Sequence, residues 1–189
     1  AIKNLADLQK YLDDATKRSD NPFYGWGVYG DLKNSKMNAV YLGDASLGLG
    51  RDYYQKDSPK NTETIEEYKK YVAQVLTELG YKDAASVAAQ IVDFEKKMAK
   101  TLLTNEQIRD SNLQYNPKIL PELKALVKNI DLPKYLANVG VKTDKVIIGE
   151  LGYYKNLDTF LTEKNIPLIK DYIKFNLVSG SAGYLSQKL

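Results

Sequence analysis

Apolar residues recur every three or four positions along most of this chain, and this spacing is typical of helices that bury one face. The clearest stripes are Leu5, Leu8 and Leu12; Ile65, Tyr68, Val72, Val75, Leu76 and Leu79; and Val87, Ile91, Phe94, Met98 and Leu102. Two last helices are expected near residues 151–163 and 167–178. The pattern therefore predicts a mainly helical protein.

The ends of these helices are marked by capping residues, prolines and glycines. Capping-box spacing is present in Thr64 with Glu67 and in Thr104 with Gln107. Pro117 and Pro121 suit the first turn of a helix, and Gly80 and Gly140 suit the residue after its end. These signals predict short, proline-bounded pieces after residue 104.

The period changes from helical to alternating in residues 21–44. Tyr24, Trp26 and Val28 are separated by single glycines, and a second apolar run follows at residues 39–42. This pattern predicts a β-hairpin with a longer loop, in which glycines let another backbone or a large ring come close. The stretch "KVIIGE", residues 145–150, is a candidate third strand. The predicted fold is one mainly α domain over residues 1–189, with many helices and a small antiparallel β-hairpin or sheet.

The composition fits an ordinary globular domain. The chain has 189 residues, of which 43% are apolar and 27% are charged, and its 27 basic and 24 acidic residues are interspersed. Because no basic block concentrates a positive field, we expect no nucleic-acid partner. No run approaches the ~20 apolar residues of a membrane span. The opening "AIKNLADLQKYL" does not have the pattern of a signal peptide.

The absence of cysteine and histidine excludes several kinds of chemistry. Without cysteine there is no disulfide, no thiolate ligand and no thiol nucleophile. Without histidine there is no Ser-His-Asp arrangement and no imidazole ligand for a metal. Protein zinc is held mainly by these two residue types, so a zinc site within the chain is not expected. Carboxylate, lysine, tyrosine, serine or threonine would have to carry any reaction of this chain alone.

The glycine-rich stretch "SLGLGRDYY", residues 46–54, does not match a phosphate-binding loop. Arg51 and Asp52 stand where that loop needs a lysine and a hydroxyl residue. We interpret the stretch as a sharp bend, in which these two residues satisfy local backbone groups and the following tyrosines pack. The residues of this structural motif are Gly48, Arg51, Asp52, Tyr53 and Tyr54.

Other candidate sites have a simpler structural interpretation. The stretch "SGSAG", residues 179–183, resembles a nucleophile elbow, but no histidine is present to activate Ser181, and a small-residue contact between helices is favoured. Asp13 with Asp14 and Glu66 with Glu67 are helix neighbours that point apart, as solvated pairs do. The 15 tyrosines could line a peptide or sugar surface, although most lie on helix stripes and are expected in the core or at its rim.

Five stretches together resemble a known family. They are "DLKNS" (residues 31–35), "LGLGRDYY" (47–54), "IVDFEKKMA" (91–99), "RDSNLQYNPKILPEL" (109–123) and "FNLVSGSAGYLS" (175–186). Their order and spacing are similar to those of the neprilysin-like zinc metalloendopeptidases, a family with bacterial oligopeptidase members. The match of LGL followed by RDYY is the most specific. The other stretches are individually weak and support the resemblance because they occur in the same order as in the family.

The resemblance implies a protein with two largely helical lobes around a cavity. One lobe of this family holds zinc on an HExxH helix, and the other caps the cavity and limits entry to short peptides. This chain resembles the N-terminal capping lobe, so no catalytic or metal-binding residue is transferred to it. The substrate-binding residues are unknown. Gly50 stands where the family usually has proline, and "NAVY" (residues 38–41) only mimics the family's substrate-binding asparagine-alanine motif, which belongs to the catalytic lobe.

The leading hypothesis is therefore a substrate-gating lobe that is catalytically inert alone. Zinc would be bound in the full-length parent, and the partners would be the catalytic lobe of the same polypeptide and short peptides. The resemblance implies a bacterial, extracytoplasmic protein, either periplasmic or surface-anchored, with exposed apolar faces where the missing lobe docks. The alternatives are a free-standing tyrosine-rich module that binds peptides or glycans, and a carboxylate-based hydrolase.

Overall fold

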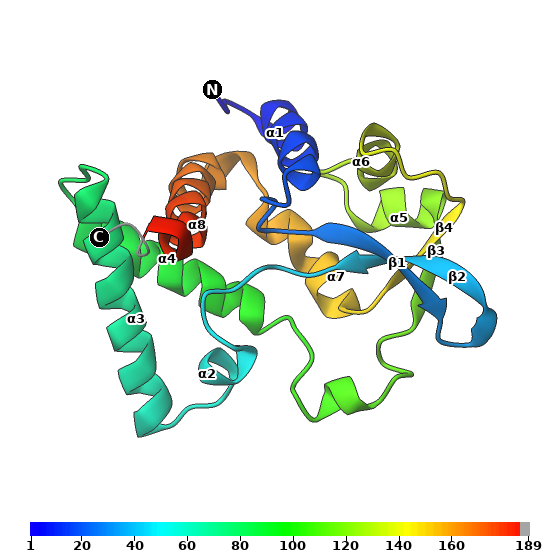
Figure 1. Cartoon of the computed structure of the whole chain (residues 1–189), viewed down its shortest axis with the longest axis horizontal. Helices are drawn as coiled ribbons and strands as arrows, with labels where there is room; N and C mark the ends of the chain where they lie inside the picture. The colour runs from blue at the N-terminus through cyan, green and yellow to red at the C-terminus, as the bar shows by residue number, and fades with distance from the viewer. Residues whose placement is uncertain (186–189) are drawn as a thin grey trace.

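Eight α-helices and four short strands make up residues 1–185, the part of the chain described in this computed structural model (Figure 1). The helices are α1 (Leu5–Lys17), α2 (Arg51–Gln55), α3 (Pro59–Glu78), α4 (Ala84–Ala99), α5 (Leu120–Leu126), α6 (Leu132–Asn138), α7 (Leu151–Phe160) and α8 (Ile166–Leu185). The strands are β1 (Gly25–Asp31), β2 (Asn34–Gly43), β3 (Asn116–Ile119) and β4 (Lys145–Ile148), and two 3₁₀ turns are η1 (Gln107–Arg109) and η2 (Glu163–Asn165). The predicted mainly helical fold is confirmed.

The strands form one mixed sheet in the order β1-β2-β4-β3. The predicted hairpin is the antiparallel pair β1 and β2. The predicted strand at residues 145–150 is β4, and it pairs with β2 in parallel, where Tyr41 lies opposite Ile147. The sequence did not predict β3, which pairs antiparallel with β4 at the edge of the sheet. Pro117 lies in β3, so its predicted first-turn position is wrong; an edge strand tolerates proline because one side needs no N–H donor.

Most of the predicted helix ends are confirmed. Gly80 and Gly140 have φ of +87° and +84° directly after α3 and α6, and this conformation favours glycine. Pro121 lies in the first turn of α5. Thr104 and Gln107 cap each other reciprocally, with a hydrogen bond from each backbone N–H to the other side chain, at 2.9 and 3.1 Å.

The predicted capping box at Thr64 and Glu67 is wrong. The N-cap of α3 is Ser58, six residues before Thr64, and its hydroxyl accepts a hydrogen bond from the N–H of Asn61 at 3.1 Å, so the helix begins at Pro59. Thr64 lies inside the helix and donates to the carbonyl of Lys60. A serine followed by proline is the stronger start signal, because the proline occupies a position that needs no N–H donor.

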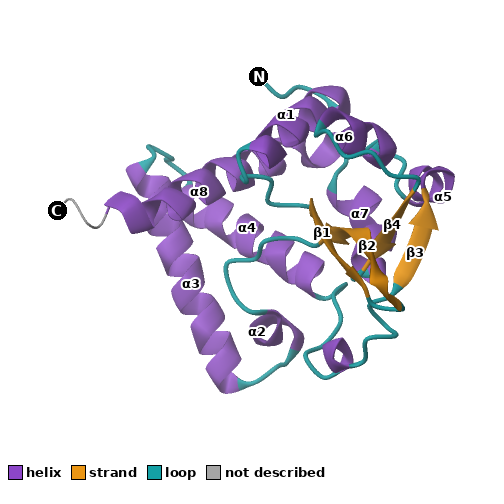
Figure 2. Ribbon diagram, turned by 45° about the vertical axis from the view of Figure 1, so that its right-hand side comes forward, coloured by secondary structure: helices purple, strands orange, loops and turns teal. Residues whose placement is uncertain are grey.

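The helices cover the sheet unequally. Figure 2 shows α3, α4 and α8 together at one end of the molecule, and α7 against the sheet at the other. The fully buried side chains include six tyrosines, namely Tyr24, Tyr54, Tyr135, Tyr153, Tyr154 and Tyr172. Two of them join α7 to the hairpin region, because Tyr153 donates to the carbonyl of Phe23 at 2.6 Å and Tyr154 donates to the carbonyl of Gly43.

The last two predicted helices are present as α7 and α8. Helix α7 ends at Phe160, slightly earlier than expected, and α8 runs to Leu185, beyond the expected residue 178. The "SGSAG" stretch therefore lies within α8. The side chains of its last three residues, 181–183, lie outside the part of the chain that is described.

Candidate functional site

The loop before α2 is tied to a buried carboxylate on α4. Glu95 is fully buried, and its two oxygens accept hydrogen bonds from four donors. Tyr54 donates at 2.6 Å, Tyr68 and Tyr172 each donate at 3.0 Å, and the backbone N–H of Gly48 donates at 3.2 Å. These donors come from α2, α3, α8 and the loop, so Glu95 joins four separate segments to α4.

Burial raises the pKa of Glu95 above its ordinary value of 4.5, while the hydrogen bonds from Tyr54, the Gly48 amide, Tyr68 and Tyr172 lower it. Burial also raises the pKa of the Tyr54 and Tyr68 hydroxyls, and the carboxylate of Glu95 adds to this effect. Because Glu95 has no exposed surface, a substrate cannot reach it. The cluster of Glu95 with Gly48 and the three tyrosines fits a structural role, and we name it the Glu95 cluster.

Arg51 forms the second connection of the same loop. Its guanidinium donates to Asp44 at 3.2 Å, to Glu150 at 2.7 Å and to the carbonyl of Leu103 at 2.8 Å. Glu150 also accepts a hydrogen bond from the N–H of Leu103 at 2.8 Å. Burial raises the pKa of Asp44, and the neighbouring Arg51 lowers it. Arg51 therefore satisfies a distant backbone carbonyl rather than a local one.

The other residues of the predicted motif have different environments. A β-carbon at Gly48 would overlap the hydroxyl of Tyr68, whereas one at Gly50 would have its nearest neighbour 3.7 Å away on Tyr53. The carboxylate of Asp52 lies 4.0 Å from the exposed Lys56 ammonium, its carbonyl accepts a hydrogen bond from the Asn61 side chain at 3.3 Å, and Tyr53 is half-buried. The structure thus brings Gly48 and Tyr54 together at the Glu95 cluster and places Arg51 at a separate one.

Sequence analysis missed Glu95, Asp44 and Glu150. A signal for Glu95 was present, because it lies four residues after Ile91 and three before Met98, within an otherwise apolar stripe. A charged residue in such a position is expected to be buried with partners. Asp44 and Glu150 carry no comparable signal.

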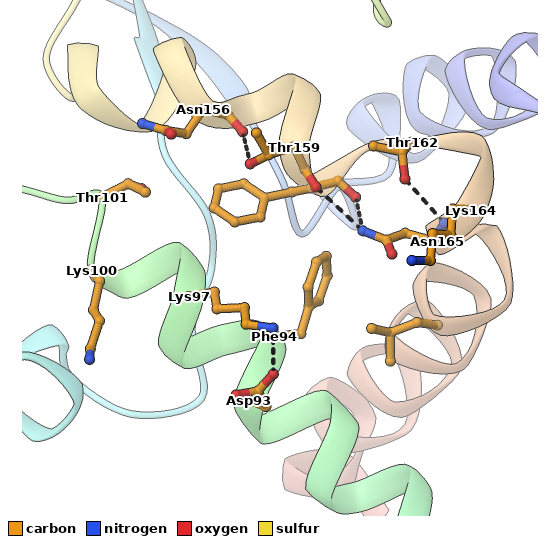
Figure 3. A pocket seen from close by; sticks show the side chains of 12 residues that line it. Asp93, Phe94, Lys97, Lys100, Thr101, Asn156, Thr159, Thr162, Lys164 and Asn165 are labelled. Atoms are coloured by element: carbon orange, nitrogen blue, oxygen red, sulfur yellow. Dashed lines mark hydrogen bonds and ion pairs between the residues drawn. The ribbon is translucent and has the colours of Figure 1, made fainter.

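A pocket of about 630 Å³ lies between α4, α7, η2 and the start of α8 (Figure 3). The rings of Phe94 and Phe160 meet edge to face in it, with centroids 6.0 Å apart. Lys97 pairs with Asp93 at 2.9 Å. The remaining lining residues are Lys100, Thr101, Asn156, Thr159, Thr162, Lys164, Asn165 and Leu168.

The carboxylate and two of the hydroxyls of this pocket have structural partners. Its one carboxylate, Asp93, is paired with Lys97, and the hydroxyls of Thr101 and Thr159 donate to the carbonyls of Met98 and Asn156. Within residues 1–185, no group of three or more histidine, cysteine, aspartate or glutamate side chains could hold a metal ion. The donor set of this part of the chain therefore does not fit zinc.

The hairpin exposes a large apolar surface. Trp26, Val28 and Tyr29 on β1 have exposed fractions of 41%, 52% and 65%, and Leu32 and Met37 at the tip are also exposed. Contiguous exposed apolar side chains, such as Trp26 and Val28 on one face of β1, often mark a binding site. Among the described residues, no helix is both long and apolar enough to span a membrane.

Comparison with known proteins gives a consistent result. The model of peptidase family M13 matches residues 1–189. The chain is 27% identical over 177 residues to endothelin-converting enzyme 1 of Cavia porcellus, covering 89% of this chain and 23% of that protein. It is 25% identical over 191 residues to a neutral endopeptidase of Lactobacillus helveticus, covering 98% of this chain and 30% of that protein. The chain thus spans less than a third of either relative.

Solved structures share the fold. The cryo-EM structure of the zinc metalloprotease ZMP1 of Mycobacterium tuberculosis in its open state matches with a TM-score of 0.83 at 20% identity, covering 97% of this chain and 29% of that one. The crystal structure of PEPO from Lactobacillus rhamnosis matches with a TM-score of 0.74 at 16% identity, covering 92% of this chain and 28% of that one. In both cases the shared region is again less than a third of the larger chain.

Proposed function

This chain belongs to peptidase family M13, and from that premise we propose that it is the N-terminal capping lobe of a zinc metalloendopeptidase that cleaves short peptides. The proposal rests on the share of each relative's length that this chain covers. Nearly all of this chain aligns with relatives named as endopeptidases or converting enzymes, yet it accounts for only 23% and 30% of the two compared in length. A chain that corresponds to one part of a larger enzyme need not contain the chemistry of the whole.

In this proposal, zinc is bound by polypeptide other than these 189 residues. The supporting argument is the donor chemistry of the chain, which has neither imidazole nor thiolate to offer. When bound, zinc would supply a polarised carbonyl and an activated water for peptide hydrolysis. The residues of this chain would act on the substrate by enclosing it.

The proposed gating role is physical exclusion. A lobe that covers a cavity admits short, flexible peptides and excludes folded proteins by size, without reading a sequence. The exposed apolar surface of the hairpin supports the existence of a further contact, because Trp26 and Val28 would gain from being covered. We place the parent outside the cytoplasm, in the periplasm or anchored at the surface, in agreement with its resemblance to bacterial members of the family.

The test compares this chain with the protein encoded by its complete gene. The complete gene should encode HExxH downstream of residue 189, and its product should cleave short peptides and lose this activity with a chelator. The 189-residue chain should show no hydrolysis in the presence of added zinc and no stoichiometric zinc by elemental analysis. Chelator-sensitive hydrolysis by the short chain would contradict the proposal.

A free-standing tyrosine-rich binding module is less well supported. The six tyrosines with the most complete burial are core residues, and several of them use their hydroxyls in internal hydrogen bonds. Tyr29 and Tyr71 are the large exposed ones among the described residues, and they lie on different elements, β1 and α3. The tyrosine content therefore reflects the core more than a binding surface.

A further inference from the structure

Strand β1 has one free edge. It is the first strand in the sheet order β1-β2-β4-β3, and among the described strands its partner is β2 (Figure 2). In an antiparallel pair, alternate residues direct both N–H and C=O groups toward the partner strand, and the others direct them away. About half of the seven residues of β1 therefore present backbone donors and acceptors at the outer edge.

Residues 23–30 of this edge lack two usual protections against pairing, charge and proline. Natural edge strands are blunted by charged side chains, by proline or by a covering element. Residues 23–30, with the sequence "FYGWGVYG", contain neither a charge nor a proline. Asp31, which ends the strand, is buried and accepts a hydrogen bond from Tyr115 at 2.8 Å. The strand is therefore uncharged from Gly25 to Gly30, and the Gly30 carbonyl already accepts a hydrogen bond from the Tyr41 hydroxyl at 3.1 Å.

The two faces of β1 differ in their side chains. Trp26 and Val28 project on one face, and Tyr29 projects on the other. The ring of Tyr29 lies over Gly27, where a β-carbon would be 2.5 Å from a ring carbon, and it meets Tyr41 edge to face at 5.9 Å. The edge thus has an aliphatic and indole surface on one side and a tyrosine pair on the other.

Two hollows flank the start of the strand. One has a volume of about 290 Å³ and includes Gly25, Gly27 and Tyr41 in its lining, and the other has a volume of about 360 Å³ and includes Gly25 and Ser19. Gly25 belongs to both, and a β-carbon added there would have no neighbour within 4 Å. Hollows of this size beside a strand can receive single side chains of a bound peptide.

We propose that the free edge of β1 binds an extended, uncharged segment of a peptide substrate as an additional strand of the sheet. The inference rests on the proposed function, because it names a docking surface for the peptides that the parent enzyme would cleave. Backbone hydrogen bonds to β1 would provide sequence-tolerant affinity, and the hollows beside Gly25 would select alternate side chains. The strand is roughly 23 Å long at about 3.3 Å per residue, which matches a peptide of about seven residues.

The edge fits a peptide better than it fits a second copy of the chain or a helix. A helix has no free backbone groups to offer to a strand edge. A symmetric second copy would pair its own β1 antiparallel, and centred on Val28 this pairing would place Asp31 opposite Gly25, so a carboxylate rather than an apolar side chain would face the hollows. A peptide with alternating medium-sized side chains would fill them and cover Trp26 and Val28.

The test uses the isotopically labelled 189-residue chain and a capped heptapeptide of alternating valine and threonine. On binding, outward-facing amides of residues 25–31 should be protected from hydrogen exchange, and their NMR shifts should move. In a control peptide, the fourth and fifth amide nitrogens carry methyl groups, which remove one N–H donor from each edge of the extended peptide. This control peptide should bind at least tenfold more weakly. Equal binding of both peptides, or protection outside β1, would overturn the proposal.

Two variants of the chain supply a matched comparison. Val28→Lys places a charge on the free edge at an exposed position, so the fold should survive while peptide binding falls at least tenfold. Leu79→Lys adds the same charge at the end of α3, at a similarly exposed position, and should bind as the unmodified chain does. Loss of binding in both variants would contradict a site on β1, as would concentration-dependent dimerisation that protects the same amides without peptide.

The outcome separates this inference from the proposed function. If the complete gene product cleaves peptides in a chelator-sensitive way but the heptapeptide does not protect β1, the inference fails and the proposed function stands. If β1 binds the peptide but the complete product shows no zinc-dependent hydrolysis, the proposed function fails.

Discussion

Gly48 lies directly against the hydroxyl of Tyr68, and there is no space between them for a β-carbon. The same hydroxyl donates to Glu95, which also accepts the backbone N–H of Gly48. Residue 48 is therefore glycine for a reason of packing, because any side chain would displace a hydroxyl that completes the hydrogen bonds of a buried carboxylate. This relationship joins the most distinctive motif of the sequence to the core.

Replacement of Gly48 by alanine should destabilise the protein by about 2 kcal/mol, in the range of overpacked core positions. The added methyl group would push the Tyr68 hydroxyl away from Glu95 and weaken both hydrogen bonds. Urea unfolding followed by circular dichroism would measure the loss. Gly50→Ala in the same loop is the control, because its nearest neighbour would be 3.7 Å away, and it should change the free energy of unfolding by less than ~0.5 kcal/mol. Equal effects of the two substitutions would contradict this explanation.

The stability of the protein should depend on pH through Glu95. Because burial raises its pKa above 4.5 in the folded state, the folded protein binds more protons than the unfolded chain between pH 4.5 and that higher value. The contribution of Glu95 is then fully present below pH 4.5, and the free energy of unfolding falls as pH rises through the folded pKa. In the Glu95→Gln variant, the side chain at position 95 is an amide and does not titrate in this pH range.

The difference in unfolding free energy between the unmodified chain and Glu95→Gln should therefore decrease as pH rises from 4.5 and become level above the folded pKa. Urea titrations at half-unit pH steps would measure it, and subtracting the two curves cancels the other titrating groups. A difference that increases with pH would mean that the tyrosine donors outweigh burial and hold the pKa below 4.5.

Removal of the Arg51 side chain should cost about 2 kcal/mol, less than the 3–5 kcal/mol of a fully buried pair because the cluster is partly exposed. Arg51→Ala leaves the carboxylates of Asp44 and Glu150 and the carbonyl of Leu103 without their shared donor. Arg51→Lys keeps the charge but has a single nitrogen, so it should recover only part of the loss. Chemical denaturation of the three proteins would rank them.

The control for Arg51 is an arginine at the surface. Arg18 pairs with Asp20 at 3.3 Å, with both side chains well exposed. Arg18→Ala should change stability by less than ~0.5 kcal/mol, because exposed pairs are screened by water and salt. If Arg18→Ala lowers the free energy of unfolding as much as Arg51→Ala does, burial does not explain the contribution of Arg51 to stability.

The parts of the fold that depend on neighbouring residues could be predicted from the sequence. The alternation of Trp26 and Val28 with glycine predicted the hairpin, and Gly80 predicted the end of a helix, because both signals act within a few residues. The short strand β3 was missed, since four residues that include Pro117 give no periodic signal. The start of α3 was missed because two possible caps lie close together along the chain.

The clusters could not be predicted, because their members are far apart in sequence. Arg51 and Glu150 are separated by 99 positions, and Tyr172 reaches Glu95 across 77. Residue spacing predicts contacts within a helix or a hairpin, but it does not show which elements the tertiary fold brings together. The interpretation of Arg51 as a partner of local backbone groups reflects this limit, since the carbonyl it satisfies belongs to Leu103.

The buried tyrosines allow a test of what an internal hydrogen bond contributes. Tyr153 and Tyr135 are both fully buried, but their hydroxyls differ. Tyr153 donates to the carbonyl of Phe23 at 2.6 Å, whereas the Tyr135 hydroxyl, whose neighbour is Thr16, makes no hydrogen bond of good geometry among the described residues. Tyr153→Phe should cost about 1–2 kcal/mol, because a buried carbonyl loses its donor, and Tyr135→Phe should be neutral or slightly stabilising.

Thermal and urea unfolding of the two variants would measure this difference directly, since each substitution removes one oxygen atom and leaves the ring in place. The ring of Tyr135 packs edge to face on Tyr24 at 4.8 Å, and that contact is retained in phenylalanine. If the two substitutions were equally costly, the hydroxyls would contribute through packing alone. The carbonyl of Phe23 would then not depend on Tyr153, and the link between α7 and the start of the hairpin would be apolar.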